Sequence, residues 1–355
     1  MSYSPYIPDK IYITSDAIDY PVSKQIMTKF DKLDLIRIKD ISTIQISTGA
    51  LLLTTQKANF YKNCPGTRNY ICCGYQILNL VNNCEIGCSY CILQDYLNVQ
   101  YITIYVNIDD LFRELSLLFN QATDRYFRIG TGELADSLST DHITNYGQLL
   151  VEYFADKRHA ILELKTKTTQ IDNIIDSDHG GRTVVSWSLN TPRIIETEEK
   201  NAPTLEQRLN AARHCAEVGY KIGFHFDPMI YYPAWEREYH EVVDRIFDYI
   251  KPGDIIWISL GALRYPPHLV DFIKEHHPKS TIVYGELISG MDGKLRYFKA
   301  LRIEMFNKMY RWLKHKDPHI FIYCCMENSD VWERSFGWSP GNSLTLKKMM
   351  DDLIR

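Results

Sequence analysis

Three cysteines in one short segment are the residues of this sequence with the clearest chemistry. NNCEIGCSYCILQ places Cys84, Cys88 and Cys91 in a C-x3-C-x2-C spacing, and the chain has nine cysteines in all. Clustered cysteines in a cytosolic chain more often bind metal or do redox chemistry than form disulfides. Three thiolates can hold three irons of a [4Fe–4S] cluster and leave the fourth open to a ligand. Zinc is the competing interpretation, although structural zinc prefers four protein ligands and no further Cys or His follows closely. Buried, unliganded cysteines are the third interpretation.

The elements that must position this loop form an alternation of strands and helices from residue 75 onward. Apolar segments predict strands over 75–80, 124–130, 159–166, 182–190, 220–227 and 254–260. Amphipathic segments predict helices over 108–120, 144–156, 204–219 and 234–250. Six such units predict an α/β fold with a parallel sheet, either an open or closed (β/α) barrel or a doubly wound sheet. In these folds the active site lies at the carboxyl ends of the strands, and the cysteine loop directly follows the first strand.

The rest of the chain divides into two extensions. KIYIT (10–14) and LDLIRI (33–38) predict strands, with the helical segment SKQIMTKF between them. We therefore expect a small N-terminal α/β extension over 1–70, a barrel over 71–262 and a C-terminal α/β extension over 263–355.

The cysteine loop and its position resemble the radical S-adenosylmethionine (SAM) superfamily. The C-x3-C-x2-C spacing, with the aromatic Tyr90 before the last cysteine, carries the resemblance. It implies a partial six-unit (β/α) radical SAM barrel and a [4Fe–4S] cluster whose open iron binds SAM. It also implies one-electron cleavage of SAM to a 5′-deoxyadenosyl radical. In such enzymes the cofactors supply the chemistry, and the protein positions and shields them.

On this resemblance, the residues after strands two and three are expected to bind SAM. Gly130 and Gly132 let the backbone approach a ligand closely. Glu133 resembles the acidic end of the superfamily's Gly-Gly-Glu motif, which holds the SAM amino group. Lys165 or Lys167 could reach the SAM carboxylate or a substrate phosphate. The competing interpretations are a glycine turn with a solvated glutamate, and lysines exposed at a strand end.

Strands four and five add polar candidates. Ser188 and Asn190 alternate with Leu189, so they share one face of a strand. Inward polar residues of a barrel strand need partners, which the ribose and carboxylate of SAM would provide. Tyr231, in FHFDPMIYY after strand five, is a candidate for the adenine and substrate zone. Internal hydrogen bonds and ordinary core packing are the alternatives.

Within the superfamily, the chain resembles the spore photoproduct lyase family over about residues 70–340. The segments CSYCILQ, FHFDPMIYYPAWEREY, SLGALRYPP and IYCCMENSDVWERSFG carry this resemblance. It implies a lyase that repairs a thymine photoproduct in DNA. In that reaction the adenosyl radical takes a hydrogen atom from the lesion, the dimer fragments, and an enzyme thiol returns a hydrogen atom.

Two positions depart from the pattern of that family. Glu133 stands where the hydrogen-donating cysteine is expected, and Ile92 stands where a tyrosine relays the radical. Tyr90 remains as the candidate catalytic tyrosine and as a residue beside the cofactor. Cys73, just before strand one, is the substitute thiol that we expect first, with an inert buried cysteine as the alternative. Further candidate thiols are Cys72, Cys324 and Cys325.

A basic segment predicts contact with DNA. Residues 293–316, GKLRYFKALRIEMFNKMYRWLKHK, carry eight Lys or Arg residues against one acid, with aromatic residues interleaved. Charge-dense helices of this kind bind phosphates, and aromatic residues can stack on unpaired bases. The alternative is a helix that docks its aromatic residues on the core and leaves its lysines solvated.

Composition limits the class of protein. Hydrophobic residues make up 45% and charged residues 24% of the 355, which is ordinary for a globular protein. A net charge of −4 excludes a global nucleic-acid footprint, so binding must be local. No apolar run suits a membrane span and the start resembles no secretory signal, so we expect a cytoplasmic protein with no membrane partner.

An electron donor such as flavodoxin or ferredoxin is the expected protein partner. The alternative functions are radical SAM modification of a peptide, RNA or small molecule, and a non-catalytic cluster or zinc protein.

Overall fold

A curled eight-stranded sheet forms the centre of the molecule. The computed structural model describes residues 3–67, 69–97 and 99–354, and the strands of this sheet follow the order β16-β12-β11-β10-β9-β8-β5-β4. Neighbouring strands are parallel except β4 and β5, which are antiparallel. The strands are β4 (Tyr61–Asn63), β5 (Gln76–Leu78), β8 (Phe127–Gly130), β9 (Ala160–Thr166), β10 (Thr183–Ser188), β11 (Lys221–Met229), β12 (Ile255–Ala262) and β16 (Phe321–Cys324). The six predicted strands are thereby confirmed, and they are neighbours in chain order.

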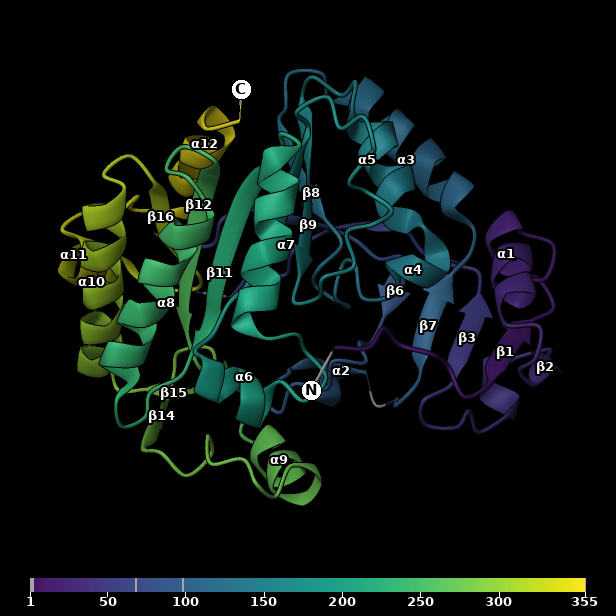
Figure 1. The fold of residues 1–355 in the computed structure, drawn as a ribbon, viewed down its shortest axis with the longest axis horizontal. Helices are drawn as coiled ribbons and strands as arrows, with labels where there is room; N and C mark the ends of the chain where they lie inside the picture. The colour runs from purple at the N-terminus through teal and green to yellow at the C-terminus, as the bar shows by residue number, and fades with distance from the viewer. Residues whose placement is uncertain (1–2, 68, 98, 355) are drawn as a thin grey trace.

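Amphipathic helices cover the outer face of this sheet (Figure 1). In α8, the buried residues Trp235, Tyr239, Val242, Val243 and Ile246 recur at helical spacing, which gives one apolar stripe. The four predicted helices are confirmed; α5 packs on β9, α7 packs on β10 and β11, and α8 packs on α7. The helices between the strands are α3 (Ile108–Gln121), α4 (Asp141–Thr144), α5 (Tyr146–Phe154), α6 (Pro192–Glu198), α7 (Leu205–Glu217) and α8 (Trp235–Tyr249).

The N-terminal segment forms a second sheet, in the order β2-β1-β3-β7-β6. Its elements are β1 (Ile11–Thr14), α1 (Pro21–Lys29), β2 (Leu35–Ile38), the short 3-10 helix at Ile41–Thr43, β3 (Leu51–Thr54), β6 (Val81–Asn82) and β7 (Ile102–Tyr105). The predicted strands at 10–14 and 33–38 correspond to β1 and β2. Strands β6 and β7 come from beyond residue 70 and flank the cysteine loop, so this sheet fixes both ends of the segment that carries the loop.

The C-terminal segment extends the main sheet and covers one end of it. Strand β16 pairs with β12, and a three-stranded sheet in the order β13-β15-β14 lies next to α10 in the chain. The elements are β13 (Arg264–Tyr265), α9 (Leu269–His276), β14 (Leu287–Ser289), β15 (Leu295–Tyr297), α10 (Lys299–Lys316), α11 (Ser329–Phe336) and α12 (Ser343–Asp352). None of the helices in the described part of the chain has the length and apolar character that crossing a membrane requires.

Candidate active site

The cysteine loop leaves β6 and ends at the short helix α2 (Leu93–Tyr96). Asn83 and Gly87 have left-handed backbones, with φ of 71° and 64°, which turn the chain tightly around the thiols. The Gln94 Nε2 group donates to the backbone carbonyls of Cys88, Ser89 and Cys91 at 2.8, 3.1 and 3.3 Å. The Gln94 side-chain amide thus holds the Cys88–Cys91 part of the loop in place.

The end of α6 supports the same loop from the other side. Cys88 and Glu199 form an antiparallel bridge, and the Tyr90 hydroxyl donates to the Glu199 carboxylate. Arg208, which is fully buried, pairs with that carboxylate and also donates to the Ser188 carbonyl at 2.9 Å. Burial alone would raise the pKa of Glu199, but the Arg208 and Lys167 cations lower it. A charged carboxylate therefore anchors Tyr90 beside the cysteines.

The three thiols match the ligands of an open cluster. Across the described ranges, no three His, Cys, Asp or Glu side chains form a group that could hold one ion. The thiolates of a cubane each bind a different iron. Burial raises the pKa of Cys88 to about 12, and the neighbouring Lys167 cation opposes that rise. The donor set of Cys84, Cys88 and Cys91 suits an open [4Fe–4S] cluster.

Inside the sheet, below the strand ends, lies a buried polar network that we did not predict from the sequence. Glu163 Oε1 accepts hydrogen bonds from Ser186 Oγ at 2.6 Å and from Trp257 Nε1 at 3.0 Å, and it lies 2.9 Å from His225 Nε2. His225 Nδ1 lies 2.7 Å from Ser259 Oγ. Burial would raise the pKa of Glu163, but His225 and the hydrogen bonds lower it to about 2. This network links the four neighbouring strands β9, β10, β11 and β12 below the site.

The strand ends bring several predicted residues together. Lys165 Nζ lies 3.9 Å from Glu133 Oε2, and Lys167 Nζ lies 5.9 Å from the centre of the Tyr90 ring. A Cβ atom at Gly132 would lie 2.8 Å from the Lys165 Cβ, so the close approach of the two strand ends requires glycine there. Burial acts to lower the pKa of Lys165, but Glu133 and other carboxylates raise it. Two cations and one carboxylate thus line the space next to the cysteine loop.

Asp136 joins these two strand ends, a role that the sequence did not reveal. Its carboxylate accepts from the Thr166 hydroxyl at 2.7 Å and from the Lys167 backbone N–H at 2.6 Å. The same carboxylate accepts from the Leu138 and Ser139 amides at 3.0 Å each. The loop after β8 is therefore held at the carboxyl end of β9.

The remaining predicted residues lie in three different settings. Ser188 pairs with His225 in the β10–β11 register, so it faces the same inner side. The Asn190 amide is engaged by protein partners, accepting from the Tyr239 hydroxyl at 2.6 Å and donating to the Pro228 carbonyl at 3.0 Å. Tyr231 is 46% exposed and lines an open groove of about 660 Å³ with Trp235 and residues of α8 and α10. Only Ser188 of these three faces the polar network, and the SAM roles of all three stay predictions.

A second ion pair, Asp227–Arg264, lies near the carboxyl ends of β11 and β12. Arg264 donates to both carboxylate oxygens of Asp227, at 2.9 and 3.0 Å, and its Nη2 lies 3.6 Å from the Cys325 sulfur. A Cβ atom at Gly261 would lie 2.6 Å from the Asp227 carboxylate, so this pair fills the space above β12. Asp227 and Arg264 were parts of recognised segments, but their pairing could not be read from the sequence.

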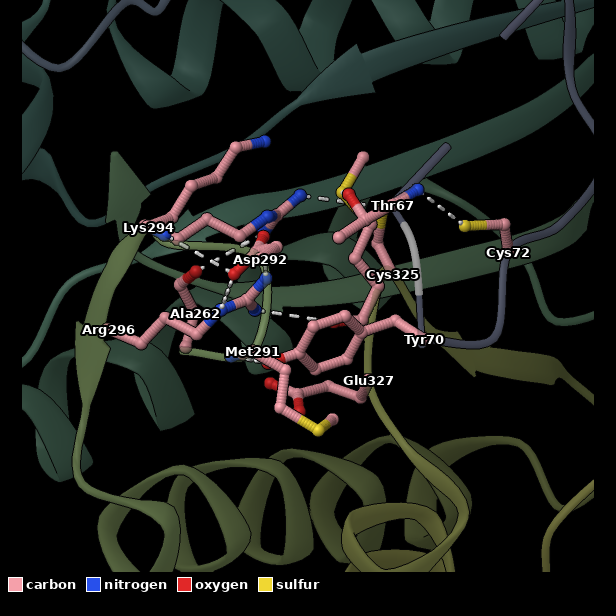
Figure 2. A network of polar contacts seen from close by, with 12 residues as sticks. Thr67, Tyr70, Cys72, Ala262, Met291, Asp292, Lys294, Arg296, Cys325 and Glu327 are labelled. Atoms are coloured by element: carbon pink, nitrogen blue, oxygen red, sulfur yellow. Dashed lines mark hydrogen bonds and ion pairs between the residues drawn. The ribbon is translucent and has the colours of Figure 1, made fainter. Parts of the chain in front are cut away.

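The candidate thiols are spread over several elements. The Cys72 sulfur accepts from the Thr67 amide at 3.4 Å, as Figure 2 shows, and its own N–H donates to Ser343 at 3.0 Å. The Cys73 carbonyl accepts from the Arg128 guanidinium. Cys324 is buried and Cys325 is partly exposed. Cys64, which we did not single out from the sequence, lies near Glu133, whose charge together with burial raises its pKa to about 11.

The basic segment docks its aromatic residues on the protein. Phe306 is buried, Tyr310 stacks on Phe336 at 4.4 Å, and Trp312 stacks on His240 at 4.8 Å. Most of its cations face carboxylates. These ion pairs are Arg296–Asp292, Lys299–Asp330, Arg302–Glu327, Lys308–Glu236 and Lys316–Asp244. The segment therefore docks most of its aromatic residues, as the alternative interpretation expects, although Phe298 is 60% exposed and most of the cations are paired with carboxylates. DNA contact here stays a prediction.

This combination of fold and site is that of a radical SAM half-barrel, a curled and mainly parallel sheet with a three-cysteine loop that follows β5 and β6 in the chain. The family model for spore photoproduct lyase matches residues 6–299, which is more than half of the chain. The chain belongs to the spore photoproduct lyase family.

Individual relatives agree with this assignment. A spore photoproduct lyase from Geobacillus sp. (strain Y412MC61) is 23% identical over 324 residues, covering 86% of this chain and 91% of the relative. One from Bacillus subtilis (strain 168) is 22% identical over 301 residues, covering 80% and 86%. A solved structure of a spore photoproduct lyase variant, with bound AdoMet and dinucleoside spore photoproduct, has a TM-score of 0.81 at 23% identity. It covers 92% of this chain and all of that one, and it shows the same fold.

Proposed function

We propose that this chain is a radical SAM lyase that repairs a thymine photoproduct in DNA. The observation that carries the proposal is the juxtaposition of the three-cysteine loop with Glu133, Lys165 and Lys167 at the strand ends of a family-matched half-barrel. Three curated relatives bear the name spore photoproduct lyase, and one solved relative binds both AdoMet and the lesion.

The residues divide into binding roles. Cys84, Cys88 and Cys91 would hold a [4Fe–4S] cluster, which would supply one-electron reduction of bound SAM. The Glu133 carboxylate would accept from the SAM ammonium group, and Lys167 would donate to its carboxylate, because charge-assisted hydrogen bonds are the strongest available here. Further candidate contacts to SAM or substrate are Tyr90, Gly132, Lys165, Ser188, Asn190 and Tyr231.

The partners follow from the chemistry. The cluster needs a one-electron donor, for which flavodoxin or ferredoxin is the candidate. All nine cysteines are free, which suits the reducing cytoplasm. The DNA lesion would enter over the strand ends, and an enzyme that acts on a base must move it out of the stack.

A second candidate function is radical SAM modification of a substrate other than DNA. It is favoured by one observation, the neutralisation of most cations of the 293–316 segment by carboxylates of the same chain. DNA binding depends on cations that are free to contact phosphates.

One assay tests the proposed function. Reconstituted protein is incubated without oxygen with SAM, dithionite and dinucleotide spore photoproduct, and thymine products and 5′-deoxyadenosine are measured by chromatography. We expect thymine products that form only when SAM is present. If 5′-deoxyadenosine forms and the photoproduct persists, the lyase proposal fails and the second candidate takes its place.

A further inference from the structure

Which group returns the hydrogen atom is open in this chain, and the following inference rests on the proposed function. When the dimer opens, a carbon-centred radical remains on the product and must gain a hydrogen atom. A thiol supplies one readily, whereas the carboxylate of Glu133, at the position expected to carry the donor, does not. The donor must therefore be a thiol that faces the space between the strand ends and the cysteine loop.

The strand register decides between neighbouring cysteines. Residues paired in a parallel sheet point to the same side, and successive residues alternate. Ser259 faces the inner network through His225 and pairs with Tyr323, so Tyr323 faces inward. Leu260 pairs with Cys324, which therefore faces the outer side. Cys325 follows at the end of β16, and its N–H donates to the Leu260 carbonyl at 2.8 Å, which keeps it in line with the sheet.

The surroundings of Cys325 agree with an inward position. Its sulfur lies 3.6 Å from Arg264 Nη2, and Arg264 is paired with Asp227 at the end of β11. Figure 2 shows Cys325 next to Thr67. Lys165, the partner of Glu133, is close enough for Cys325 and Asp227 to act on its pKa. Cys325 thus shares one polar space with the residues expected to contact SAM.

One further observation points to a ligand here. The Tyr75 hydroxyl is buried without a hydrogen-bond partner and lies where a side chain at Gly130 would be, at 1.9 Å from the ideal Cβ position. In addition, burial and the Asp227 carboxylate raise the pKa of Cys325 well above its usual value. The sulfur therefore keeps the hydrogen atom that the reaction requires.

The other thiols are less suited. Cys72 is held in the turn by the Thr67 amide. Cys215 and Cys324 are buried, and Cys324 faces Arg302 and Glu327 instead. Cys64 lies near Glu133 and Cys73 lies near Cys325, and these two thiols are the competitors that an experiment must separate from Cys325.

We propose that Cys325 is the catalytic thiol that gives its hydrogen atom to the product radical. The S–H bond breaks and a C–H bond forms on thymine, which leaves a thiyl radical on Cys325. The thiyl radical would then take a hydrogen atom from the 5′-deoxyadenosine made in the first step, which restores the thiol and the adenosyl radical. That radical would rejoin methionine to give SAM again, and the electron would return to the cluster. No oxidant or reductant is consumed, and the Asp227–Arg264 pair positions the sulfur.

Labelling tests this proposal directly. In D2O the thiol carries deuterium, so wild-type protein should place one deuterium in the thymine product. Cys325→Ala should keep the cluster and SAM cleavage but lose thymine formation. Cys325→Ser keeps a polar group beside Arg264 but has an O–H bond too strong to donate, and it should fail equally. Cys72→Ala is the matched control and should keep deuterated thymine. Cys64→Ala and Cys73→Ala test the two competing thiols, and loss of thymine from either one, with Cys325→Ala still active, would overturn the proposal.

A second readout needs neither the cluster nor turnover. In iron-free protein at high pH, where part of the Cys325 thiol is ionised despite its raised pKa, iodoacetamide should modify Cys325 slowly. Dinucleotide spore photoproduct should slow that modification further, as measured by mass spectrometry. The buried Cys215 should stay unmodified in both cases. Deuterated thymine from Cys325→Ala at the wild-type rate, or no protection of Cys325, would overturn the inference while leaving the lyase function intact. Absence of thymine from wild type, with SAM cleavage intact, would overturn the function and the inference together.

Discussion

Replacing Glu199 with glutamine tests how the cysteine loop is held in place. Glu199 and Arg208 are both buried, with side-chain exposures of 1% and 0%. Removing one partner of a buried ion pair typically costs about 3–5 kcal/mol, because the other charge stays buried without compensation. Arg208 keeps its bonds to the Pro203 and Ser188 carbonyls at 3.0 and 2.9 Å. We therefore expect the lower end, about 3 kcal/mol.

The lost stability should appear as a lower melting temperature. Unfolding entropy is about 2.1 cal/mol/K per residue, so for a chain of this length about 3 kcal/mol corresponds to a shift of about 4 °C. The assay is calorimetry on iron-free Glu199→Gln protein. Glu196→Gln is the matched control, because Glu196 is exposed on the same helix, α6. Because Tyr90 also loses its charged acceptor, Glu199→Gln should retain less iron after reconstitution.

Equal melting temperatures for Glu199→Gln and Glu196→Gln would refute this reasoning. That result would mean that the attraction between Glu199 and Arg208 only offsets the free-energy cost of removing both charges from water. Lower stability with unchanged iron retention would instead mean that the pair stabilises the fold but does not position the cysteine loop.

Two further predictions concern single carboxylates of the site. Glu133→Gln should weaken SAM binding by about 1–3 kcal/mol, because a charge-assisted hydrogen bond becomes a neutral one; unchanged affinity by calorimetry would reject the role. The pKa of Glu163 in the folded protein is about 2, below its usual value of about 4.3. Its network therefore stabilises the folded protein above about pH 4.3, and this stabilisation is lost as the pH falls toward 2. Denaturant unfolding from pH 5 to pH 2 should therefore show a shallower pH dependence for Glu163→Gln than for wild type, and parallel curves would contradict the assignment.

The sequence predicted the parts of the fold that depend on local patterns. Apolar, β-branched segments between amphipathic helices were enough to locate the six inner strands, and the spacing of Cys84, Cys88 and Cys91 was enough to locate the loop. Strand β16 was missed, although IYCC lay in a recognised segment, because pairing with β12 is a long-range contact. The same holds for β7, whose partner β3 lies far earlier in the chain.

The polar contacts of the site depend on register, which the sequence does not reveal. Glu163 stands out in the apolar strand HAILELKT, and a buried charge there is a signal that needs a partner. Its partner His225 lies 62 positions later, and only the ordering of four strands brings them to 2.9 Å. Cys325 is a similar case, because its difference from Cys324 depends on the side of the sheet that each one faces.

Iron and sulfide analysis tests the central claim most directly. After anaerobic reconstitution, wild-type protein should contain about four irons and four sulfides per chain, as three thiolates can hold a cubane. Cys84→Ala, Cys88→Ala and Cys91→Ala should each lose the cluster, while Cys215→Ala, which changes a buried cysteine elsewhere, should keep it. One zinc per chain with no sulfide would contradict the radical SAM account.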